Sequence, residues 1–265
     1  MDLKNYTDQA IEVVKKIAAF QLEERAKFQQ DAVEVKGKND LVSYVDVISE
    51  KMLVEGLSGI IPEAGFLTEE ETTENKNENL FWIIDPLDGT TNFIHNLPSF
   101  GISIALATKT ELLIGVVMEP NMNECFYAWK NGGAYCNNNA INVTQNKLLE
   151  NCLIATGFPI NNHDSIANYL DLTEFFIRNS RGVRRMGSAS IDLVYTACGR
   201  FDAFYEYNLK PWDVAGGAII VKEAGGQISD FNNRENWLYG QTIVASNTFI
   251  HESLVEVIKN KYYKK

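Results

Sequence analysis

Apolar residues recur at every third or fourth position near the start of the chain, and this spacing predicts a long amphipathic helix over residues 4–30. The apolar positions on its predicted face are Ile11, Val14, Ala18 and Leu22. A second helix is expected over residues 45–58. The polar stretch EETTENKNEN, residues 70–79, has no apolar period and is predicted to be a loop.

Short apolar runs with a period of two follow between residues 81 and 143, separated by turn signals such as KTE and PNMN. They predict an antiparallel meander. After about residue 145, strand-like and helix-like runs alternate, which predicts βα layering. The expected fold is mixed α/β (α+β): an N-terminal α+β domain over 1–145, rich in antiparallel strands, and a C-terminal α/β domain over 146–265.

The charge balance excludes some classes of ligand. Among 265 residues, 35 are acidic and 24 basic, for a formal net charge of −11. Nucleic acid as the main ligand and anionic lipid both call for a cationic surface, so neither is expected. An acidic protein that binds an anion needs local positive charge from a few basic residues or from bound cations.

The cysteines are far apart and form no CxxC pair; they are Cys125, Cys136, Cys152 and Cys198. They are interpreted as reduced thiols of a cytoplasmic protein. The charged N-terminal stretch has no secretory core, and no apolar run is long enough to predict a membrane span.

The stretch LFWIIDPLDGTTNF, residues 80–93, concentrates the candidate chemistry. Its apolar half predicts a buried strand that ends at Asp85. Pro86 cannot donate to a strand ladder, so Asp85 and Asp88 are expected on a tight turn that aims both carboxylates at one point. Gly89 would relieve crowding in that turn.

Thr90 or Thr91 can cap a following short helix, TNFIHN. The N-terminus of a helix suits a phosphate group, and carboxylates beside a phosphate make chemical sense if divalent cations lie between them. The alternative is that Asp85 and Asp88 only cap a turn and a helix.

Further carboxylates stand at similar junctions. Glu69 ends the run AGFLTEE, Asp213 follows Trp212 as an expected N-cap, and Asp46 lies near the start of the second helix, where capping is an equal alternative. Oxygen donors favour Mg²⁺, Mn²⁺ or Ca²⁺ over Zn²⁺. Together with a phosphate seat, they predict Mg²⁺-assisted phosphoryl transfer to water.

Two stretches, WIIDPLDGTTNF (82–93) and WDVAGGAIIVKEAGG (212–226), resemble the two signatures of the inositol monophosphatase family of lithium-sensitive phosphatases. The likeness extends over essentially the whole chain. It implies a layered αβαβα sandwich of the sugar-phosphatase type and two or three Mg²⁺ ions in each active site, with Mn²⁺ as a possible substitute. It also implies a homodimer.

The resemblance assigns metal ligands by position. Glu69, Asp85 and the backbone carbonyl of Leu87 would hold the first ion. Asp85, Asp88 and Asp213 would hold the second, and Glu69 would hold a third through water.

The resemblance also assigns catalytic and substrate residues. Thr90 and Glu69 would orient the attacking water, with Asp46 behind Thr90 to polarise it. Lys36 would lie near the metals as a counter-charge, although Lys38 also fits the pattern. The expected substrate contacts are Asp88, Gly89, Thr90, Gly187, Ser188, Ala189, Glu206 and Asp213.

A dense basic cluster consists of Arg178, Arg181, Arg184 and Arg185. It is either a solvated face or dimer contact, or a site for a second anionic group of the substrate. The loop over residues 159–165 stands where relatives tune substrate choice, and its sequence does not reveal the preference.

The resemblance favours a Mg²⁺-dependent phosphomonoesterase that hydrolyses inositol monophosphate or a similar polyol or sugar phosphate. The alternatives within the family are an NADP(H) 2′-phosphatase and a fructose-1,6-bisphosphatase. A more distant alternative is a non-catalytic regulatory or RNA-processing partner.

Overall fold

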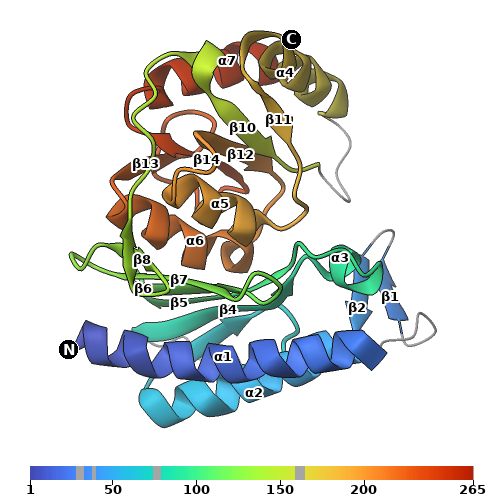
Figure 1. Cartoon of the computed structure of the whole chain (residues 1–265), viewed down its shortest axis with the longest axis vertical. Coiled ribbons are helices and arrows are strands. Elements are labelled where there is room, and N and C mark those ends of the chain that lie inside the picture. Colours follow the sequence, from blue (N-terminus) through green and yellow to red (C-terminus); the bar gives the residue numbers. More distant parts are fainter. Residues whose placement is uncertain (28–32, 38–39, 74–78, 159–164, 265) are drawn as a thin grey trace.

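A computed structural model describes residues 1–27, 33–37, 40–73, 79–158 and 165–264. Helices and sheets are stacked in the order α, β, α, β, α (Figure 1), which confirms the predicted layered sandwich. The helices are α1 (Leu3–Lys27), α2 (Tyr44–Ile60), α3 (Thr90–Ile94), α4 (Ile166–Asn179), α5 (Ala189–Ala197), α6 (Pro211–Glu223) and α7 (His251–Tyr262). The first two match the predicted helices, apart from residues 28–30, which lie outside the described residues.

Helices α1 and α2 cover the outer face of a sheet whose described part has seven strands in chain order. These strands are β3 (Gly65–Thr68), β4 (Leu80–Asp88), β5 (Gly101–Thr108), β6 (Leu112–Glu119), β7 (Glu124–Trp129), β8 (Ala134–Cys136) and β9 (Asn139–Ile141). The predicted antiparallel meander runs from β4 to β9, and β3 adds a parallel edge beside β4.

The second large sheet has the order β11-β10-β12-β14-β13. Its strands are β10 (Leu153–Thr156), β11 (Gly182–Arg184), β12 (Ala203–Tyr207), β13 (Gly226–Ser229) and β14 (Thr242–Asn247). β10 pairs in parallel with β11 and β12, whereas β14 is antiparallel to its neighbours. A separate hairpin of β1 (Val33–Gly37) and β2 (Asp40–Ser43) lies beside α3.

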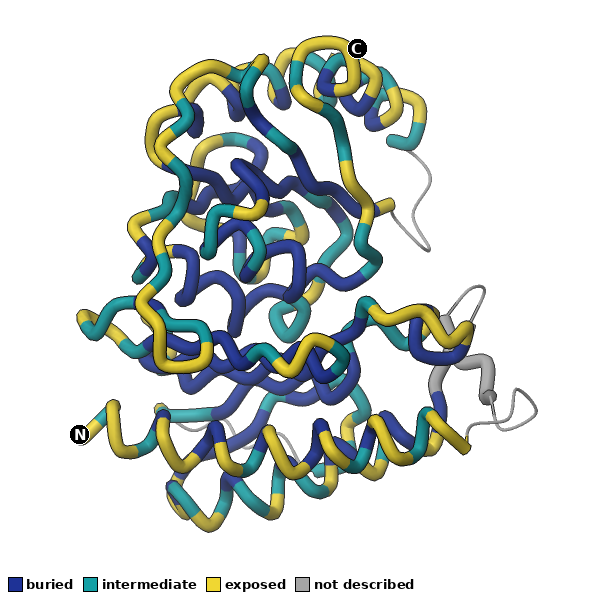
Figure 2. Tube along the Cα trace, in the orientation of Figure 1, coloured by how far each residue is buried: buried dark blue, intermediate teal, exposed yellow. Residues whose placement is uncertain are grey.

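Helices α5 and α6 form the middle layer and contact both large sheets. The buried part of the chain is concentrated there and on the two sheets (Figure 2). Two glycines allow α6 to approach closely: a Cβ on Gly115 of β6 would fall 2.5 Å from the carbonyl oxygen of Gly216. A Cβ on Gly216 would fall 2.5 Å from the hydroxyl of Ser103 on β5. This contact holds the start of α6 against the first sheet.

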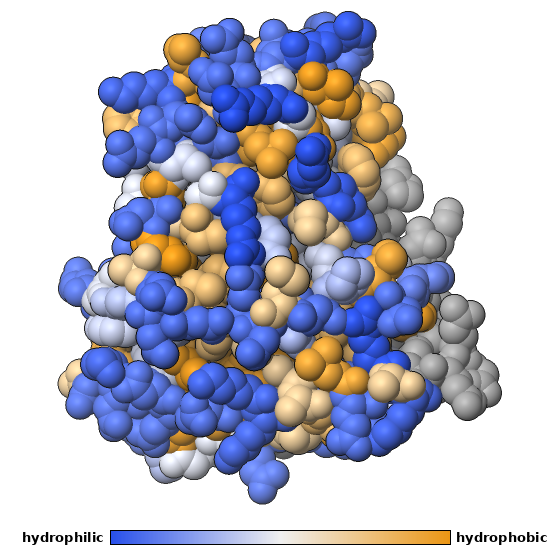
Figure 3. Space-filling view, viewed as in Figure 1, coloured by the Kyte–Doolittle hydropathy of each residue, from blue (hydrophilic) through white to orange (hydrophobic). Residues whose placement is uncertain are grey.

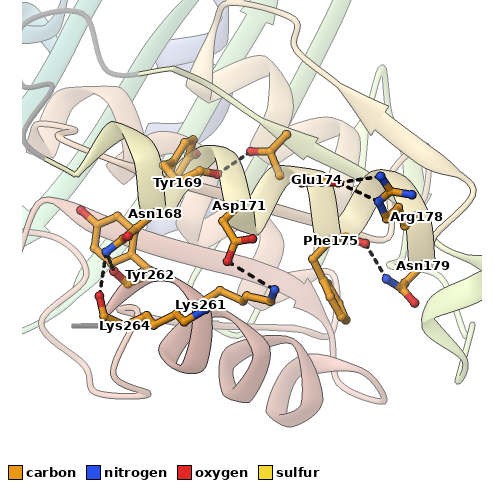
Figure 4. Close-up of polar contacts among 11 residues, drawn as sticks. Asn168, Tyr169, Asp171, Glu174, Phe175, Arg178, Asn179, Lys261, Tyr262 and Lys264 are labelled. Carbon is orange, nitrogen blue, oxygen red and sulfur yellow. Dashed lines mark hydrogen bonds and ion pairs between the residues drawn. The ribbon is translucent and has the colours of Figure 1, made fainter.

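Helices α4 and α7 cover the outer face of the second sheet and are joined by polar contacts (Figure 4). Lys261 of α7 lies 3.3 Å from Asp171 of α4, and the Asn168 amide donates to the carbonyl of Tyr262 at 2.9 Å. Arg178 pairs with Glu174 on the solvent side of α4. This first member of the arginine cluster therefore has a surface role.

The face in Figure 3 is mostly hydrophilic, with hydrophobic side chains interspersed. None of the helices in the described ranges combines the length and the apolar character that crossing a membrane requires. All four cysteines are free thiols. The division into domains at residue 145 stays a prediction.

His251, at the start of α7, is fully buried between the hydroxyls of Ser229 and Ser246, at 3.0 and 2.8 Å from its two ring nitrogens. Burial lowers the pKa of its imidazole from 6.5 to about 4. In the unfolded chain this imidazole binds a proton near pH 6.5, whereas in the folded chain it binds one only near pH 4. Lowering the pH through this window therefore favours unfolding.

We expect the free energy of unfolding to fall between pH 6.5 and pH 4 by on the order of 3 kcal/mol through this residue, at about 1.4 kcal/mol per pKa unit. Urea unfolding of the wild type and of His251→Gln across this range measures the effect. Both proteins have the same carboxyl groups, so the contribution of these groups cancels in the difference between the two free energies of unfolding. Two parallel curves would contradict the assignment.

Candidate metal and phosphate site

A bulge in β4 places the first two carboxylates. Asp85 pairs with Ser103 and Asp88 with Gly101 on β5, with a shift of register between them. The prediction that Pro86 ends the strand was wrong: the bulge absorbs the residue that cannot donate, and the ladder resumes at Asp88. Asp85 is buried and Asp88 half-buried at the same strand end.

Gly89 joins β4 to α3 with φ at +99°, and a Cβ there would lie 3.0 Å from the carbonyl oxygen of Ser99. The predicted need for glycine at this position is therefore confirmed. The prediction that Thr90 or Thr91 caps this helix was wrong, because Gly89 occupies the N-cap position and there is no side-chain capping bond. The Thr90 hydroxyl is thereby free for other acceptors.

The Thr90 hydroxyl lies 3.0 Å from Asp46 Oδ1 and 3.1 Å from the carbonyl oxygen of Leu87. It has one proton, so it donates to one acceptor at a time. Asp46 also caps α2, because its Oδ2 accepts from the Ser43 amide at 2.9 Å and from the Ser43 hydroxyl at 2.6 Å. The capping role and the contact with Thr90 thus belong to the same carboxylate, and the structure bears out both.

Asp213 reaches the site from α6. It is the third residue of that helix, and its Oδ2 accepts from the Lys210 amide at 2.7 Å. The N-cap is Lys210, so the prediction of Asp213 as the N-cap was wrong, because Pro211 already occupies the first helical position. Burial, together with the charge of Asp88, raises the pKa of Asp213 to about 7.

The carboxylates influence one another across the two halves of the chain. Burial raises the pKa of Glu69 well above its usual range, and the charges of Asp213 and Asp46 raise it further. Burial does the same to Asp85, with contributions from Glu69, Asp88 and Asp213. Glu69 and Asp85 are close enough for each side chain to shift the pKa of the other. Carboxylates gathered so that their charges raise one another's pKa are a sign of a site short of positive charge.

The donors present suit Mg²⁺: the Leu87 carbonyl, the Thr90 hydroxyl and carboxylates from three separate elements, all of them oxygen. Within the described ranges, no three His, Cys, Asp or Glu side chains are already spaced to hold one ion. The chemistry of these donors therefore fits Mg²⁺, whose charge would offset the repulsion among the carboxylates.

Asp88 connects β4 to α5. Its Oδ2 accepts from the Ser188 hydroxyl at 2.7 Å and from the Ser190 amide at 2.6 Å. Ser188 is also the N-cap of α5, and Gly187 before it has φ at +87°. The predicted Gly187–Ala189 stretch therefore lies at the site. The contribution of Ser190 was missed, since a backbone donor leaves no signal in the sequence.

Glu206, on β12, lies against Gly157, where a Cβ would fall 2.1 Å from its carboxylate atoms. Burial and the charges of Asp213 and Asp88 raise the pKa of Glu206, while Arg185 lowers it. Asp192 of α5 is 1% exposed, and neither of its carboxylate oxygens has a hydrogen-bond partner among the described residues. The sequence analysis missed both Gly157 and Asp192, although an aspartate inside the apolar run SIDLVY was a usable signal.

Arg184 and Lys36 are the basic residues that the sequence analysis proposed for the site. Arg184 is exposed and donates to the carbonyl of its neighbour Val183 at 3.0 Å, whereas Arg185 is the arginine that acts on Glu206. Lys36 belongs to β1, but its side chain is outside the described part of the chain, as is all of Lys38. The role of Lys36 stays a prediction, and residues 159–164 of the substrate loop also lie outside the described ranges.

Comparisons with known proteins agree with the geometry. Residues 2–262 match the model of the inositol monophosphatase family. A putative Nus factor SuhB of Neisseria meningitidis is 42% identical over 88% of this chain and 91% of its own. A fructose-1,6-bisphosphatase/inositol-1-monophosphatase of Thermotoga maritima is 39% identical over 86% of both chains.

Among solved structures, the extragenic suppressor protein suhB from Bartonella henselae superposes with a TM-score of 0.89 at 34% identity, covering 95% of this chain and 97% of its own. The resemblance of the two signature stretches is thereby confirmed. The chain belongs to the inositol monophosphatase family, and this membership supports phosphatase activity.

Proposed function

We propose that this protein is a Mg²⁺-dependent phosphomonoesterase that hydrolyses inositol monophosphate or a similar polyol or sugar phosphate. The observation that supports it most is the convergence of Glu69, just beyond β3, Asp85 of β4 and Asp213 of α6 at one all-oxygen site, where the charges of Glu69 and Asp213 raise the pKa of Asp85. A structural role alone would not favour repelling carboxylates at one point.

Glu69, Asp85 and the Leu87 carbonyl are proposed to hold one ion, and Asp85, Asp88 and Asp213 a second. A third ion held through water by Glu69, and Mn²⁺ in place of Mg²⁺, belong to the same proposal. When bound, the ions supply charge neutralisation of the phosphate and a lowered pKa of water.

The chain's own residues orient the attacking water. When Thr90 donates its proton to Asp46, the lone pairs of its hydroxyl oxygen remain as acceptors for a hydrogen of that water. Glu69 then takes the proton that the water loses as its oxygen bonds to phosphorus. The bond between phosphorus and the ester oxygen breaks as the new bond forms, and the departing alkoxide takes a proton from a water held by Asp213. The proton on Glu69 neutralises the hydroxide left by that water, so the products are inorganic phosphate and an alcohol. The amides of Gly89 and Thr90, at the start of α3, are proposed to bind the phosphate oxygens.

The charge around Glu206 favours a polyol over a second phosphate. Glu206 and the buried Asp192 are both acidic, and each lowers the electrostatic potential at the other. Hydroxyl groups can donate to a carboxylate, whereas a second phosphate would be repelled. The positive charge of Arg185 opposes this repulsion. The name of the Thermotoga relative also includes fructose-1,6-bisphosphatase, so fructose 1,6-bisphosphate and NADP(H) are the alternative substrates to test.

A second candidate function is a non-catalytic regulatory role, because the Neisseria relative is named a putative Nus factor. The net charge of −11 is unfavourable for nucleic acid as the main ligand of this chain. A homodimer and a cytoplasmic location are proposed on the family resemblance and on the free thiols.

Mg²⁺ should stabilise the protein more at pH 8 than at pH 5. The pKa is raised from 3.8 to about 6 for Asp46 and to about 7 for Asp213, so the metal-free folded chain keeps protons that the unfolded chain has lost. The contribution of these two carboxyl groups to stability therefore falls as the pH rises from about 4 to about 7. Deprotonation also frees the carboxylates for Mg²⁺.

Free Mg²⁺ at about ten times its Kd adds about 1.4 kcal/mol, a rise in Tm of about 3–6 °C for a chain of this size. Thermal unfolding in EDTA and in Mg²⁺, with NaCl of equal ionic strength as the control, measures the rise. An equal shift at both pH values would contradict the titration of these carboxyl groups.

Asp88→Asn should leave the fold intact and lower kcat by about 10²-fold or more, the scale on which a lost transition-state contact acts. The amide can still accept from Ser188, but its charge is gone. Asp171→Asn is the matched control, because it makes the same chemical change at the surface pair with Lys261. Phosphate release from inositol 1-phosphate measures both, and wild-type turnover in Asp88→Asn would remove Asp88 from the ligand set.

The wild type should favour inositol 1-phosphate over fructose 1,6-bisphosphate and NADP by about tenfold or more in kcat/KM, the discrimination expected from one charged contact. Glu206→Gln should reduce this preference by removing the repulsion. Assays of the three phosphates with both proteins decide the point. A wild-type preference for NADP would overturn the polyol assignment.

A further inference from the structure

Glu50 is a fully buried carboxylate in the middle of α2. It lies four residues, about one helical turn, after Asp46, so the two side chains leave the same face of the helix. Asp46 contacts Thr90, while Glu50 contacts a different segment, the one that follows β3. One helix face therefore carries two acidic side chains that reach two separate parts of the site.

Both oxygens of Glu50 are satisfied by that segment. Its Oε2 accepts from the Glu70 amide at 2.7 Å, and its Oε1 accepts from the amide and the hydroxyl of Thr72 at 2.8 and 2.7 Å. Bonds to an ionised acceptor are stronger than bonds between neutral groups. A buried carboxylate is tolerated because these three donors replace its hydration.

The segment needs such an anchor. The ladder between β3 and β4 ends at Thr68, which pairs with Ile84, so Glu69 lies just beyond the regular strand. Two residues later, Glu71 has φ at +51°, a left-handed conformation that is unfavourable for a glutamate. The hydrogen bonds to Glu50 bracket Glu71 on both sides and hold the chain in this turn.

We propose that Glu50 is a positioning residue that sets the place of Glu69 relative to Thr90. The proposal rests on the function proposed above, in which these two side chains orient the attacking water. Asp46 holds the Thr90 hydroxyl, and Glu50 holds the backbone beside Glu69. Because both carboxylates belong to α2, this helix fixes the position of Glu69 relative to Thr90. Glu50 touches neither substrate nor metal in this assignment.

Glu50→Gln tests the proposal, because the glutamine nitrogen cannot accept and one of the two anchored amides loses its partner. We expect the Mg²⁺ concentration for half-maximal activity to rise and kcat to fall, each by about 10- to 100-fold, as for other residues that support a metal ligand. Direct Mg²⁺ titration by calorimetry should show the same loss of affinity. Glu55→Gln, on the exposed side of α2, should match the wild type.

A role in stability alone would lower the Tm of Glu50→Gln without changing Mg²⁺ affinity or turnover in the folded protein, and that result would overturn the proposal. Thr72→Val removes a single hydrogen bond and keeps the carboxylate, so it should weaken Mg²⁺ binding by a few-fold. If Glu50→Gln fails to fold while Thr72→Val binds Mg²⁺ as the wild type does, the proposal is also overturned.

The outcomes separate this inference from the proposed function. A wild type that hydrolyses phosphates, with equally active Glu50→Gln, rejects only the role of Glu50. A wild type that binds Mg²⁺ but hydrolyses no phosphate, with weaker binding in Glu50→Gln, rejects only the proposed reaction. A wild type that binds no Mg²⁺ rejects both.

Discussion

Repulsion among clustered carboxylates, of which Asp85 is buried and Glu69 and Asp213 are half-buried, is the constraint on which the rest of this structure depends. The charges of Glu69 and Asp213 raise the pKa of Asp85, and the charge of Asp213 raises the pKa of Glu69, in surroundings where burial already disfavours charge. A chain brings such groups together only if other contacts outweigh the repulsion or a cation removes it. The tight packing of α6 on the first sheet, through Gly115 and Gly216, supplies those other contacts.

The scaffold meets this constraint by holding each carboxylate with backbone or hydroxyl donors. Asp46 accepts from Ser43, Asp88 accepts from Ser188 and Ser190, and Asp213 accepts from Lys210. Several of these donors lie at helix starts, where amides lack intrahelical partners. The hydrogen bonds that cap these helices therefore also hold the carboxylates of the candidate site. For Asp46, the sequence offered capping and a contact with Thr90 as alternatives, and the same side chain makes both.

The second half of the site is also acidic. Asp192 and Glu206 extend the negative field beyond the proposed metal ligands, with Arg185 as a nearby counter-charge. Arg178 and Arg184 are exposed: Arg178 pairs with Glu174, and Arg184 donates to the carbonyl of Val183. In the proposed function, metal binding and substrate choice would share one electrostatic origin.

The sequence by itself determined the helix periods, the meander, the layered fold class and the identity of the carboxylates, because these follow from local periodicity and from two recognisable stretches. It could not show that β4 continues past Pro86 or that Gly157 and Asp192 adjoin Glu206. Those features depend on contacts between segments far apart in the chain, such as Thr156–Gly157 beside β12. Only the tertiary structure decided them, because a bulge, a close approach or a buried charge is defined by the neighbour it meets.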